Sequence, residues 1–243
     1  MRVGVISDIH SNLPALERVY KNLEGEVDEI YFLGDIVGYG PFPNECVDYL
    51  KKFSFKVIGN HDAAVAGIRS YDDFNEYARF AIDWTKENIS IENIEKLKNL
   101  PQKKELEDLY LVHGSLRDPL DEYLINYYSV FANFELMEKN IAFFGHTHLA
   151  GVFIFSEKEK EIYYVSFINE GKLKLERGHK YLINPGSVGQ PRDGNWKSSY
   201  VVYDTRSKVI EFYRVEYNLE SLQKYMKMLG FPRHLWERLQ YGR

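Results

Sequence analysis

The sequence predicts a protein of the α/β class, built on a sheet whose core strands run parallel. Short apolar runs recur along the chain and each stops at a polar cluster, which is typical of buried strands. A helical pattern separates the first two runs, so the three segments together predict a parallel βαβ unit. The chain has 243 residues, of which 44% are hydrophobic, and we expect one domain over residues 1–243.

Six apolar runs are the candidate core strands. Their length and their richness in Val, Ile, Phe and Tyr are typical of buried strands. They are Val3–Ser7, Glu29–Leu33, Phe53–Ile58, Leu109–Val112, Ile141–Phe144 and Tyr181–Ile183. Polar residues follow each run directly, so we expect them at the carboxyl edge of the sheet, where open α/β sheets bind ligands.

Capping residues and helical periodicity predict the helices of the first half. Ser11 or Asn12 caps the first helix, which ends at Gly25. Residues 64–108 are expected to form a helical insertion over the sheet edge. The further helices are expected at Asn44–Lys52, Asp72–Asn88 and Ile91–Leu100.

The pattern changes to that of β-hairpins at Gly151, with turns expected at Ser156–Glu161 and Asn169–Lys172. Further strands are expected at Ser199–Asp204 and Val209–Val215. Residues 216–243 then form a helical tail, whose first helix runs from about Leu219 to Leu229 and is stopped by glycine and proline.

Composition excludes several classes of protein. No apolar run reaches the roughly 18 residues of a transmembrane helix, and the N-terminal run ends in Asp8 and His10 rather than in a signal-peptide cleavage site. The single cysteine, Cys46, excludes an intrachain disulfide and predicts a cytoplasmic location. The net charge of −5 argues against a nucleic-acid partner.

Five polar clusters hold five of the seven histidines. They are Asp8-x-His10, Gly34-Asp35, Gly59-Asn60-His61-Asp62, His113-Gly114 and Gly145-His146-Thr147-His148. One histidine after a strand is more often a hydrogen-bonded structural residue than a ligand. So many imidazoles and carboxylates at one edge of one predicted sheet would be costly to bury, and metal ions would offset that cost.

The mixture of ligand types indicates the class of metal. Carboxylate, amide and imidazole ligands suit Mn, Fe, Zn, Co or Ni better than Ca, and the lack of a thiolate cluster excludes a structural zinc ribbon. Seven candidate ligands suit two divalent ions about 3.5–4 Å apart that share one carboxylate. Manganese is the expected metal, with Fe, Zn, Ni, Co or Mg as alternatives. The glycines at 34, 59, 114 and 145 either turn the backbone sharply into the site or end strands in the ordinary way.

In this order, the five motifs resemble those of the calcineurin-like metallophosphoesterases over residues 1–204. The spacing, the insertion and Asn184-Pro185-Gly186-Ser187 resemble the smaller prokaryotic branch of YfcE-type phosphodiesterases and diadenosine tetraphosphatase-like proteins. The resemblance implies a four-layer α-β-β-α sandwich whose second sheet is built from the later strands.

The resemblance also implies a role for each motif. The first metal would be held by Asp8, His10 and His148, Asp35 would bridge the two metals, and the second would be held by Asn60, His113 and His146. The two ions would lower the pKa of a bridging water that attacks the phosphate in line. His61 is not a ligand in the family; it would be catalytic, stabilising the transition state or protonating the leaving oxygen.

One position departs from the broader family. Protein Ser/Thr phosphatases have an Asp-Arg pair where this chain has Gly38-Tyr39. In those enzymes the aspartate orients the catalytic histidine and the arginine binds phosphate, so the departure argues against a protein phosphatase. Asp62 is a candidate for orienting His61, and an aspartate that caps a turn is an equally good interpretation.

Three residues are candidate substrate contacts, each with a structural alternative. Asn12 would contact substrate or cap a helix, and Asn184 lies in a loop that would close over the metals. Arg192 would clamp a phosphate or remain a solvated loop charge. The aromatic residues of Gly38–Pro43 would stack on a nucleobase or form a rigid turn, and the turn is slightly favoured.

The sequence therefore predicts a two-metal-dependent phosphoesterase that hydrolyses a phosphodiester or a small phosphorylated metabolite. The alternative is a diadenosine polyphosphate hydrolase. A non-catalytic metal-binding scaffold is disfavoured because His61 and all seven candidate ligands are present. The acidic charge disfavours a DNA nuclease. A homodimer is compatible with the aromatic content but not required by it.

Overall fold

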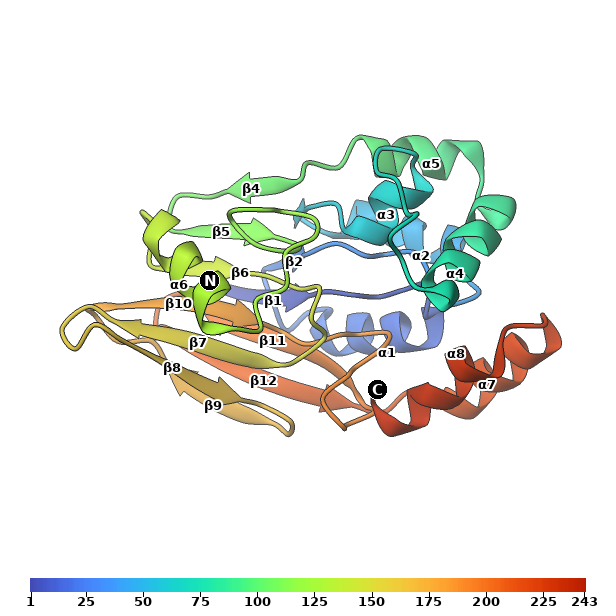
Figure 1. The fold of residues 1–243 in the computed structure, drawn as a ribbon. Coiled ribbons are helices and arrows are strands. Elements are labelled where there is room, and N and C mark those ends of the chain that lie inside the picture. The colour runs from blue at the N-terminus through green and yellow to red at the C-terminus, as the bar shows by residue number, and fades with distance from the viewer.

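Two six-stranded sheets lie face to face in the computed structural model, which describes residues 1–243 (Figure 1). In spatial order, the first sheet contains β3 (Phe55–Lys56), β2 (Glu29–Phe32), β1 (Arg2–Ile6), β11 (Ser198–Asp204), β12 (Val209–Val215) and β9 (Gly171–Lys174). The second contains β4 (Lys103–Glu105), β5 (Leu109–Val112), β6 (Ile141–Phe143), β10 (His179–Asn184), β7 (Gly151–Ser156) and β8 (Glu161–Ser166).

Each sheet has a parallel core with antiparallel strands added at its sides. β1, β2 and β3 are parallel in the first sheet, and β5, β6 and β10 are parallel in the second. In the first pair, Val3 lies beside Glu29 and Ile6 beside Phe32. Because this register brings the carboxyl ends of β1 and β2 level, the polar residues that follow the two strands emerge next to each other.

Most of the helices belong to the layer outside the first sheet, and one lies outside the second (Figure 1). The first layer contains α1 (Leu13–Leu23), α2 (Pro43–Val47), η1 (Asp48–Lys52), α3 (Asn60–Val65), α4 (Glu76–Asn88), α5 (Ile91–Lys98), α7 (Leu219–Met228), α8 (Arg233–Glu237) and η2 (Arg238–Tyr241). α6 (Tyr127–Leu136) covers the second sheet. None of these helices has the length and apolarity needed to cross a membrane.

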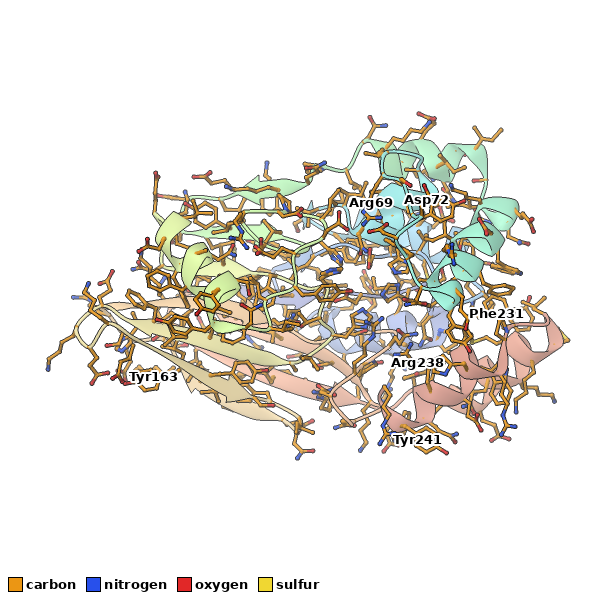
Figure 2. The ribbon with its side chains drawn as sticks, viewed as in Figure 1. Arg69, Asp72, Tyr163, Phe231, Arg238 and Tyr241 are labelled. Carbon is orange, nitrogen blue, oxygen red and sulfur yellow. The ribbon has the colours of Figure 1, made fainter.

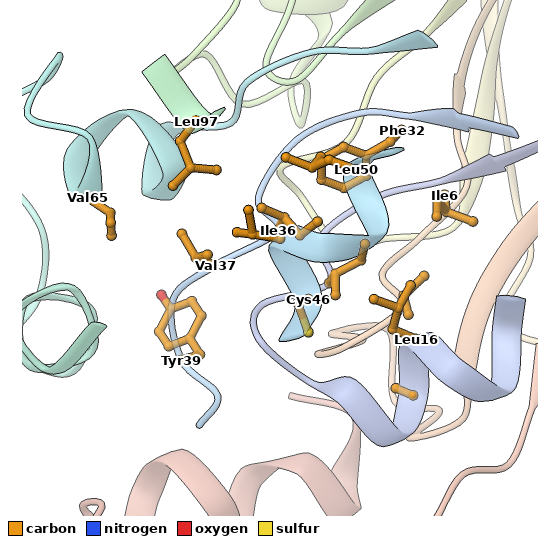
Figure 3. Close-up of a cluster of buried hydrophobic side chains, with 14 of the residues drawn as sticks. Ile6, Leu16, Phe32, Ile36, Val37, Tyr39, Cys46, Leu50, Val65 and Leu97 are labelled. Atoms are coloured by element: carbon orange, nitrogen blue, oxygen red, sulfur yellow. The ribbon is translucent and has the colours of Figure 1, made fainter. Parts of the chain in front are cut away.

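Three apolar clusters hold the layers together. Val3, Val5 and Phe143 belong to the cluster between the sheets. On the outer face of the first sheet, Ile6 and Phe32 pack with the helices in the cluster of Figure 3. A third cluster joins α6 to the second sheet. The order helix, sheet, sheet, helix confirms the expected four-layer α-β-β-α sandwich.

The contact between β1 and α1 explains one glycine of the core. A Cβ atom on Gly4 would lie 2.9 Å from a methyl group of Leu23. The absence of a side chain at this position lets α1 pack closely on its strand. The helix begins after Asn12, whose Oδ1 accepts a hydrogen bond from the Ala15 N–H.

Several expected elements differ in the structure. The second sheet is built from later strands, as expected, although the last two strands, β11 and β12, join the first sheet. The segment Asn169–Lys172 is not a hairpin turn, because β9 leaves β8 and pairs with β12 in the other sheet. A period-two pattern identifies a strand but not its partner, which explains why the pairing of β9 could not be predicted.

Local elements differ as well. Only two residues of Phe53–Ile58 form a strand, and the expected helix Asn44–Lys52 divides into α2 and the 3₁₀ segment η1. The helix expected from Asp72 begins at Glu76, behind the cap Asn75. The elements α3, α6 and β4 were not expected; α6 is apolar on its exposed side as well as its buried side, so its periodicity is weak.

Candidate metal centre

The five polar clusters converge where the two sheets end side by side. Asp8 and Asp35 follow β1 and β2 of the first sheet, whereas His113 and His146 follow β5 and β6 of the second. The expectation that one sheet edge carries all the clusters is therefore wrong, because the site is divided between two sheets. Asn60 reaches the site from the first residue of α3.

The backbone at the site is strained. Five of the seven candidate ligands have a positive φ: Asp8 (53°), His10 (50°), Asp35 (59°), His146 (64°) and His148 (60°). This left-handed conformation is costly for residues other than glycine and tends to cluster at functional sites. Of the four motif glycines, only Gly34 has a positive φ (93°). Gly59 is needed for close approach instead, because a Cβ atom there would overlap the Asp35 carboxylate.

The first group of candidate ligands contains Asp8, His10 and His148, all buried. His10 Nδ1 lies 3.1 Å from the Val37 carbonyl oxygen, and His148 Nδ1 lies 2.6 Å from the Gln190 carbonyl oxygen. A carbonyl oxygen only accepts, so each Nδ1 carries the proton and each Nε2 has a free lone pair. The two Nε2 atoms are 3.2 Å apart, and Asp8 Oδ1 lies 3.4 Å from His148 Nε2.

The second group has the same organisation. His113 Nδ1 faces the Leu33 carbonyl oxygen at 2.8 Å, and His146 Nε2 faces that of Asp121 at 3.2 Å. The remaining nitrogens, His113 Nε2 and His146 Nδ1, lie 3.1 Å apart. Burial alone would lower the pKa of His113, but the Asp35 carboxylate outweighs burial and raises that pKa to about 9. Asn60 Oδ1, 3.2 Å from His113 Nε2, completes the group. Each of the four imidazoles thus turns one nitrogen inward, while a backbone carbonyl fixes its outer nitrogen.

Asp35 lies between the two groups. Its Oδ2 is 3.3 Å from His113 Nε2 and 3.6 Å from His10 Nε2. Its Oδ1 accepts a hydrogen bond of 2.9 Å from the backbone N–H of His61. One carboxylate oxygen is thus close to both groups, which is the position of a ligand shared by two ions.

The chemistry of this donor set fits divalent cations. Burial lowers the pKa of His10, His146 and His148 well below the ordinary value, so these imidazoles are neutral near pH 7. Burial, reinforced by the charge of Asp35, raises the pKa of Asp8 to about 7. Asp8 Oδ2 is also buried without a hydrogen-bond partner. Lone pairs that face each other in a buried site repel unless a cation lies between them.

Asp62 organises the loops beneath the site. Its carboxylate accepts hydrogen bonds of 2.8–3.1 Å from four backbone N–H groups, those of Asp35, Ile36, Val37 and Gly59. It makes no hydrogen bond to the His61 ring. Of the two interpretations of Asp62, the structure therefore supports the aspartate that caps a turn.

His61 lies in the first turn of α3, beside both groups of candidate ligands. Its ring packs between those of Tyr39 and Phe74, with centroids 4.6 and 5.1 Å away. Burial lowers the pKa of His61 to about 4, so the ring is neutral at pH 7. Its Nδ1 is buried without a hydrogen-bond partner. The ring lines a cavity of about 220 Å³ with Asn60, His146 and other residues.

Two of the three candidate substrate contacts are used in structural hydrogen bonds. Asn12 caps α1 and donates through Nδ2 to the Gly189 carbonyl. Asn184 donates to the Gly145 carbonyl and to Thr147 Oγ1, bracing the loop that carries His146 and His148.

Arg192 is placed differently from these two asparagines. Its guanidinium lies 5.8 Å from the centre of the Tyr39 ring, and its Nε is buried without a partner. The positive charge of Arg192 also reaches the ligand groups. It lowers the pKa of His148, second in effect to burial. Arg192 therefore faces the site rather than bulk solvent.

The aromatic residues after Asp35 form part of the protein frame. The Phe42 ring stacks on that of Tyr225 with a centroid distance of 5.0 Å, and the Tyr39 ring packs against those of His10 and His61. The rigid-turn interpretation of this segment agrees with these contacts. Tyr123, which the sequence pattern did not indicate, stacks on the His146 ring at 3.8 Å.

The chain matches the model of the calcineurin-like phosphoesterase superfamily domain over residues 1–208. The uncharacterized protein MJ0912 of Methanocaldococcus jannaschii is 40% identical over 250 residues, which cover 99% of this chain and 98% of that protein. Phosphodiesterase YfcE of Escherichia coli strain K12 is 25% identical over 216 residues, covering 84% and 88% of the two chains.

A solved structure shares the whole fold. The crystal structure of a metallophosphoesterase from Sphaerobacter thermophilus aligns with a TM-score of 0.88 and 39% identity, covering 100% of both chains. The likeness therefore includes the helical insertion and the C-terminal tail as well as the two sheets.

Proposed function

This chain belongs to the calcineurin-like phosphoesterase superfamily, in the branch of the YfcE-type phosphodiesterases, and we propose that it is a two-metal phosphoesterase. Its substrate would be a phosphodiester or a small phosphorylated metabolite, hydrolysed by water without a covalent phosphoenzyme. Manganese is the metal we expect. The single cysteine, Cys46, is free and buried, in keeping with the cytoplasm as the compartment.

One observation carries the proposal. Two groups of buried ligand atoms converge, and the Asp35 carboxylate lies within 3.6 Å of a histidine from each. The first metal would be held by Asp8, His10 and His148, the second by Asn60, His113 and His146, and Asp35 would serve both. Divalent ions bound there would attract phosphate oxygens and lower the pKa of a water molecule.

The protein's own groups then have defined tasks. His61 is neutral, so at pH 7 its ring N–H can donate a hydrogen bond to a phosphate oxygen or to the leaving oxygen. Arg192 adds positive charge on the side of Tyr39. Asp62 fixes the loop that carries Asp35 through three backbone hydrogen bonds. These groups position the phosphate and stabilise its developing charge.

The test compares wild type with His61→Asn after metal removal and reloading with Mn²⁺. The substrates are p-nitrophenyl phosphate, bis(p-nitrophenyl) phosphate and diadenosine tetraphosphate. We expect hydrolysis that requires Mn²⁺ and falls about 10²–10⁴-fold in the variant, while two ions per chain still bind. If wild type with two ions bound hydrolyses none of the compounds, the proposal is wrong and a metal-binding scaffold is favoured.

A further inference from the structure

The cavity beside His61 is continuous with the candidate metal centre. Three residues of its lining, Asn60, His61 and His146, belong to that centre or adjoin it, and each is at most 5% exposed. A group esterified to a phosphate at the centre can therefore enter this cavity. The rest of the lining has no task in the proposed hydrolysis: Tyr39, Arg69, Asp73, Phe74, Asn75, Ala78, Asp121 and Tyr123.

Flat side chains form the walls of the cavity. The Tyr123 ring stacks on that of His146 at an angle of 29°, yet Tyr123 remains 43% exposed, so the face of its ring away from His146 is accessible. The Phe74 ring lies 5.1 Å from that of His61 and 4.6 Å from the Arg69 guanidinium. Aromatic walls of this kind favour a ligand that is itself a flat ring, by stacked or edge-to-face contacts.

Arg69 fixes the two sides of the cavity to each other. It lies in the segment between α3 and α4 and is labelled in Figure 2. Its guanidinium donates to both carboxylate oxygens of Asp73, at 3.0 and 2.8 Å, and its Nε donates to Asp121 at 2.8 Å. Asp121 precedes Tyr123 in the loop after β5, and its carbonyl oxygen faces His146 Nε2. The walls are thus held in place before a ligand binds, which lowers the entropic cost of binding.

The charges of the lining do not favour an anion. Arg69 is paired with two carboxylates, those of Asp73 and Asp121, so the three charged groups together carry an excess of one negative charge. His61 and His146 add no charge at pH 7, because burial lowers the pKa of both rings. A second phosphoryl or carboxylate group would therefore be repelled, whereas an uncharged ring would not.

The volume of the cavity limits the size of the ligand. A cavity of about 150 Å³ is large enough to hold benzene, and sites for drug-sized ligands begin at about 300 Å³. With about 220 Å³, this cavity fits one small ring system and excludes a folded or extended peptide.

We propose that Tyr123 and Phe74 form a binding site for an uncharged planar ring esterified to the phosphate. The inference rests on the proposed function and narrows its substrate class to phosphate esters that carry such a ring close to the phosphorus atom. Tyr123 and Phe74 are then specificity-determining residues, one from the loop after β5 and one from the segment before α4.

The test measures binding without turnover. Calorimetry on the Mn²⁺-loaded protein compares methylphosphonate, cyclohexylphosphonate and phenylphosphonate, which have no ester bond to hydrolyse. The three share one charged group, so the ratios of their Kd values isolate the contribution of the ring and of its flatness. We expect phenylphosphonate to bind about fivefold more tightly than either of the others, the effect of one ring-stacking contact.

The variants are Tyr123→Leu and Phe74→Leu, each expected to lower the preference for phenylphosphonate about threefold. The Kd of methylphosphonate in each variant corrects for any displacement of His146 or His61. Tyr163→Leu is the matched control, because Tyr163 is also 43% exposed but lies far from Arg69 at the other end of the molecule (Figure 2). It should keep the wild-type preference.

Equal Kd values for phenylphosphonate and cyclohexylphosphonate in wild type would overturn the ring site, as would a preference that neither leucine variant changes or a wild type that binds none of the three. Each of these results leaves the proposed function intact if wild type hydrolyses the ester panel. Conversely, a ring preference that both variants lower, in a protein that hydrolyses no ester, supports the ring site and refutes the proposed catalysis.

Discussion

His10 and His148 face each other through Nε2 atoms that are 3.2 Å apart and both free of protons. The two residues are 138 positions apart in the chain, and their rings stack at an angle of 22°. Backbone carbonyls hold both rings in the tautomer that turns lone pairs inward. Such a contact is repulsive on its own and becomes favourable when a cation lies between the nitrogens.

Metal removal should therefore destabilise the folded protein. Each site is expected to contribute about 2.7 kcal/mol when free Mn²⁺ is 100 times its Kd. For a chain of this size, each kcal/mol corresponds to about 2–4 °C in Tm. Calorimetric melting with EDTA and with Mn²⁺ checks this. His148→Ala should reduce the metal content, whereas His179→Ala, at a histidine outside both ligand groups, should not. Equal Tm values with and without Mn²⁺ would contradict a cation-bound site.

Gly38→Ala should displace the catalytic candidate His61 while leaving the metal ligands in place. Gly38 has φ of 89°, and a Cβ atom there would lie 2.6 Å from His61 Nδ1. We expect kcat on bis(p-nitrophenyl) phosphate to fall by about 10², because a misplacement of about 1 Å has that effect. The bound-metal content should stay at the wild-type value.

Gly25→Ala is the matched control for this substitution. Gly25 has a similar φ of 80°, but a Cβ atom there would meet nothing within 4 Å. Both variants should lose about 1–2 kcal/mol of stability from backbone strain, and only Gly38→Ala should lose activity. Equal kcat values in the two variants would show that contact with His61 is not what requires glycine at position 38.

Much of the fold and of the candidate site could be predicted because both rest on local patterns. Leu109–Val112 is a strand, as expected. Both ends of the first helix lie within one turn of their expected positions. Within each sheet the polar clusters lie together because they follow neighbouring parallel strands, but the meeting of the two sheets at one site could not be predicted. The family motifs then identified the residues that the structure gathers into two groups.

The remaining features depend on contacts between distant segments, which local patterns do not encode. The sequence pattern of a strand does not reveal which strand it pairs with. The pairings of β9 with β12 and of β11 with β1 could therefore not be predicted. Asp62 was an ambiguous turn residue in the sequence, because its four N–H partners belong to two separate loops.

Asp62→Asn should weaken both the fold and metal binding. Each carboxylate oxygen of Asp62 accepts from two backbone N–H groups, so an amide nitrogen in place of one oxygen leaves two donors unpaired. We expect a loss of about 2 kcal/mol or more in urea unfolding, and a 10–100-fold lower metal affinity because Asp35 is held less firmly. Asp28→Asn is the control, since Asp28 accepts one exposed hydrogen bond from Arg2. Wild-type metal affinity in Asp62→Asn would refute this positioning role.

Glu122→Gln should reduce stability in a pH-dependent way. Burial alone would raise the pKa of Glu122, but hydrogen bonds from Arg117, Ser115 and Asn133 outweigh it and lower the pKa. Because the folded-state pKa is lower than the unfolded-state value, the ionised carboxylate stabilises the fold above the unfolded-state pKa. That contribution is lost as the pH falls through the folded-state pKa.

At pH 7 we therefore expect Glu122→Gln to be about 1–3 kcal/mol less stable than wild type in urea unfolding. The difference should shrink as the pH falls below about 4.3, the ordinary pKa of glutamate, because the wild-type carboxylate then becomes protonated. Glu135→Gln, on the exposed side of α6, should stay within about 0.5 kcal/mol of wild type at every pH. A difference between Glu122→Gln and wild type that is the same at pH 7 and at about pH 3 would mean that Glu122 acts through packing. The contact between α6 and the loop after His113 would then depend on packing rather than on the charge of Glu122.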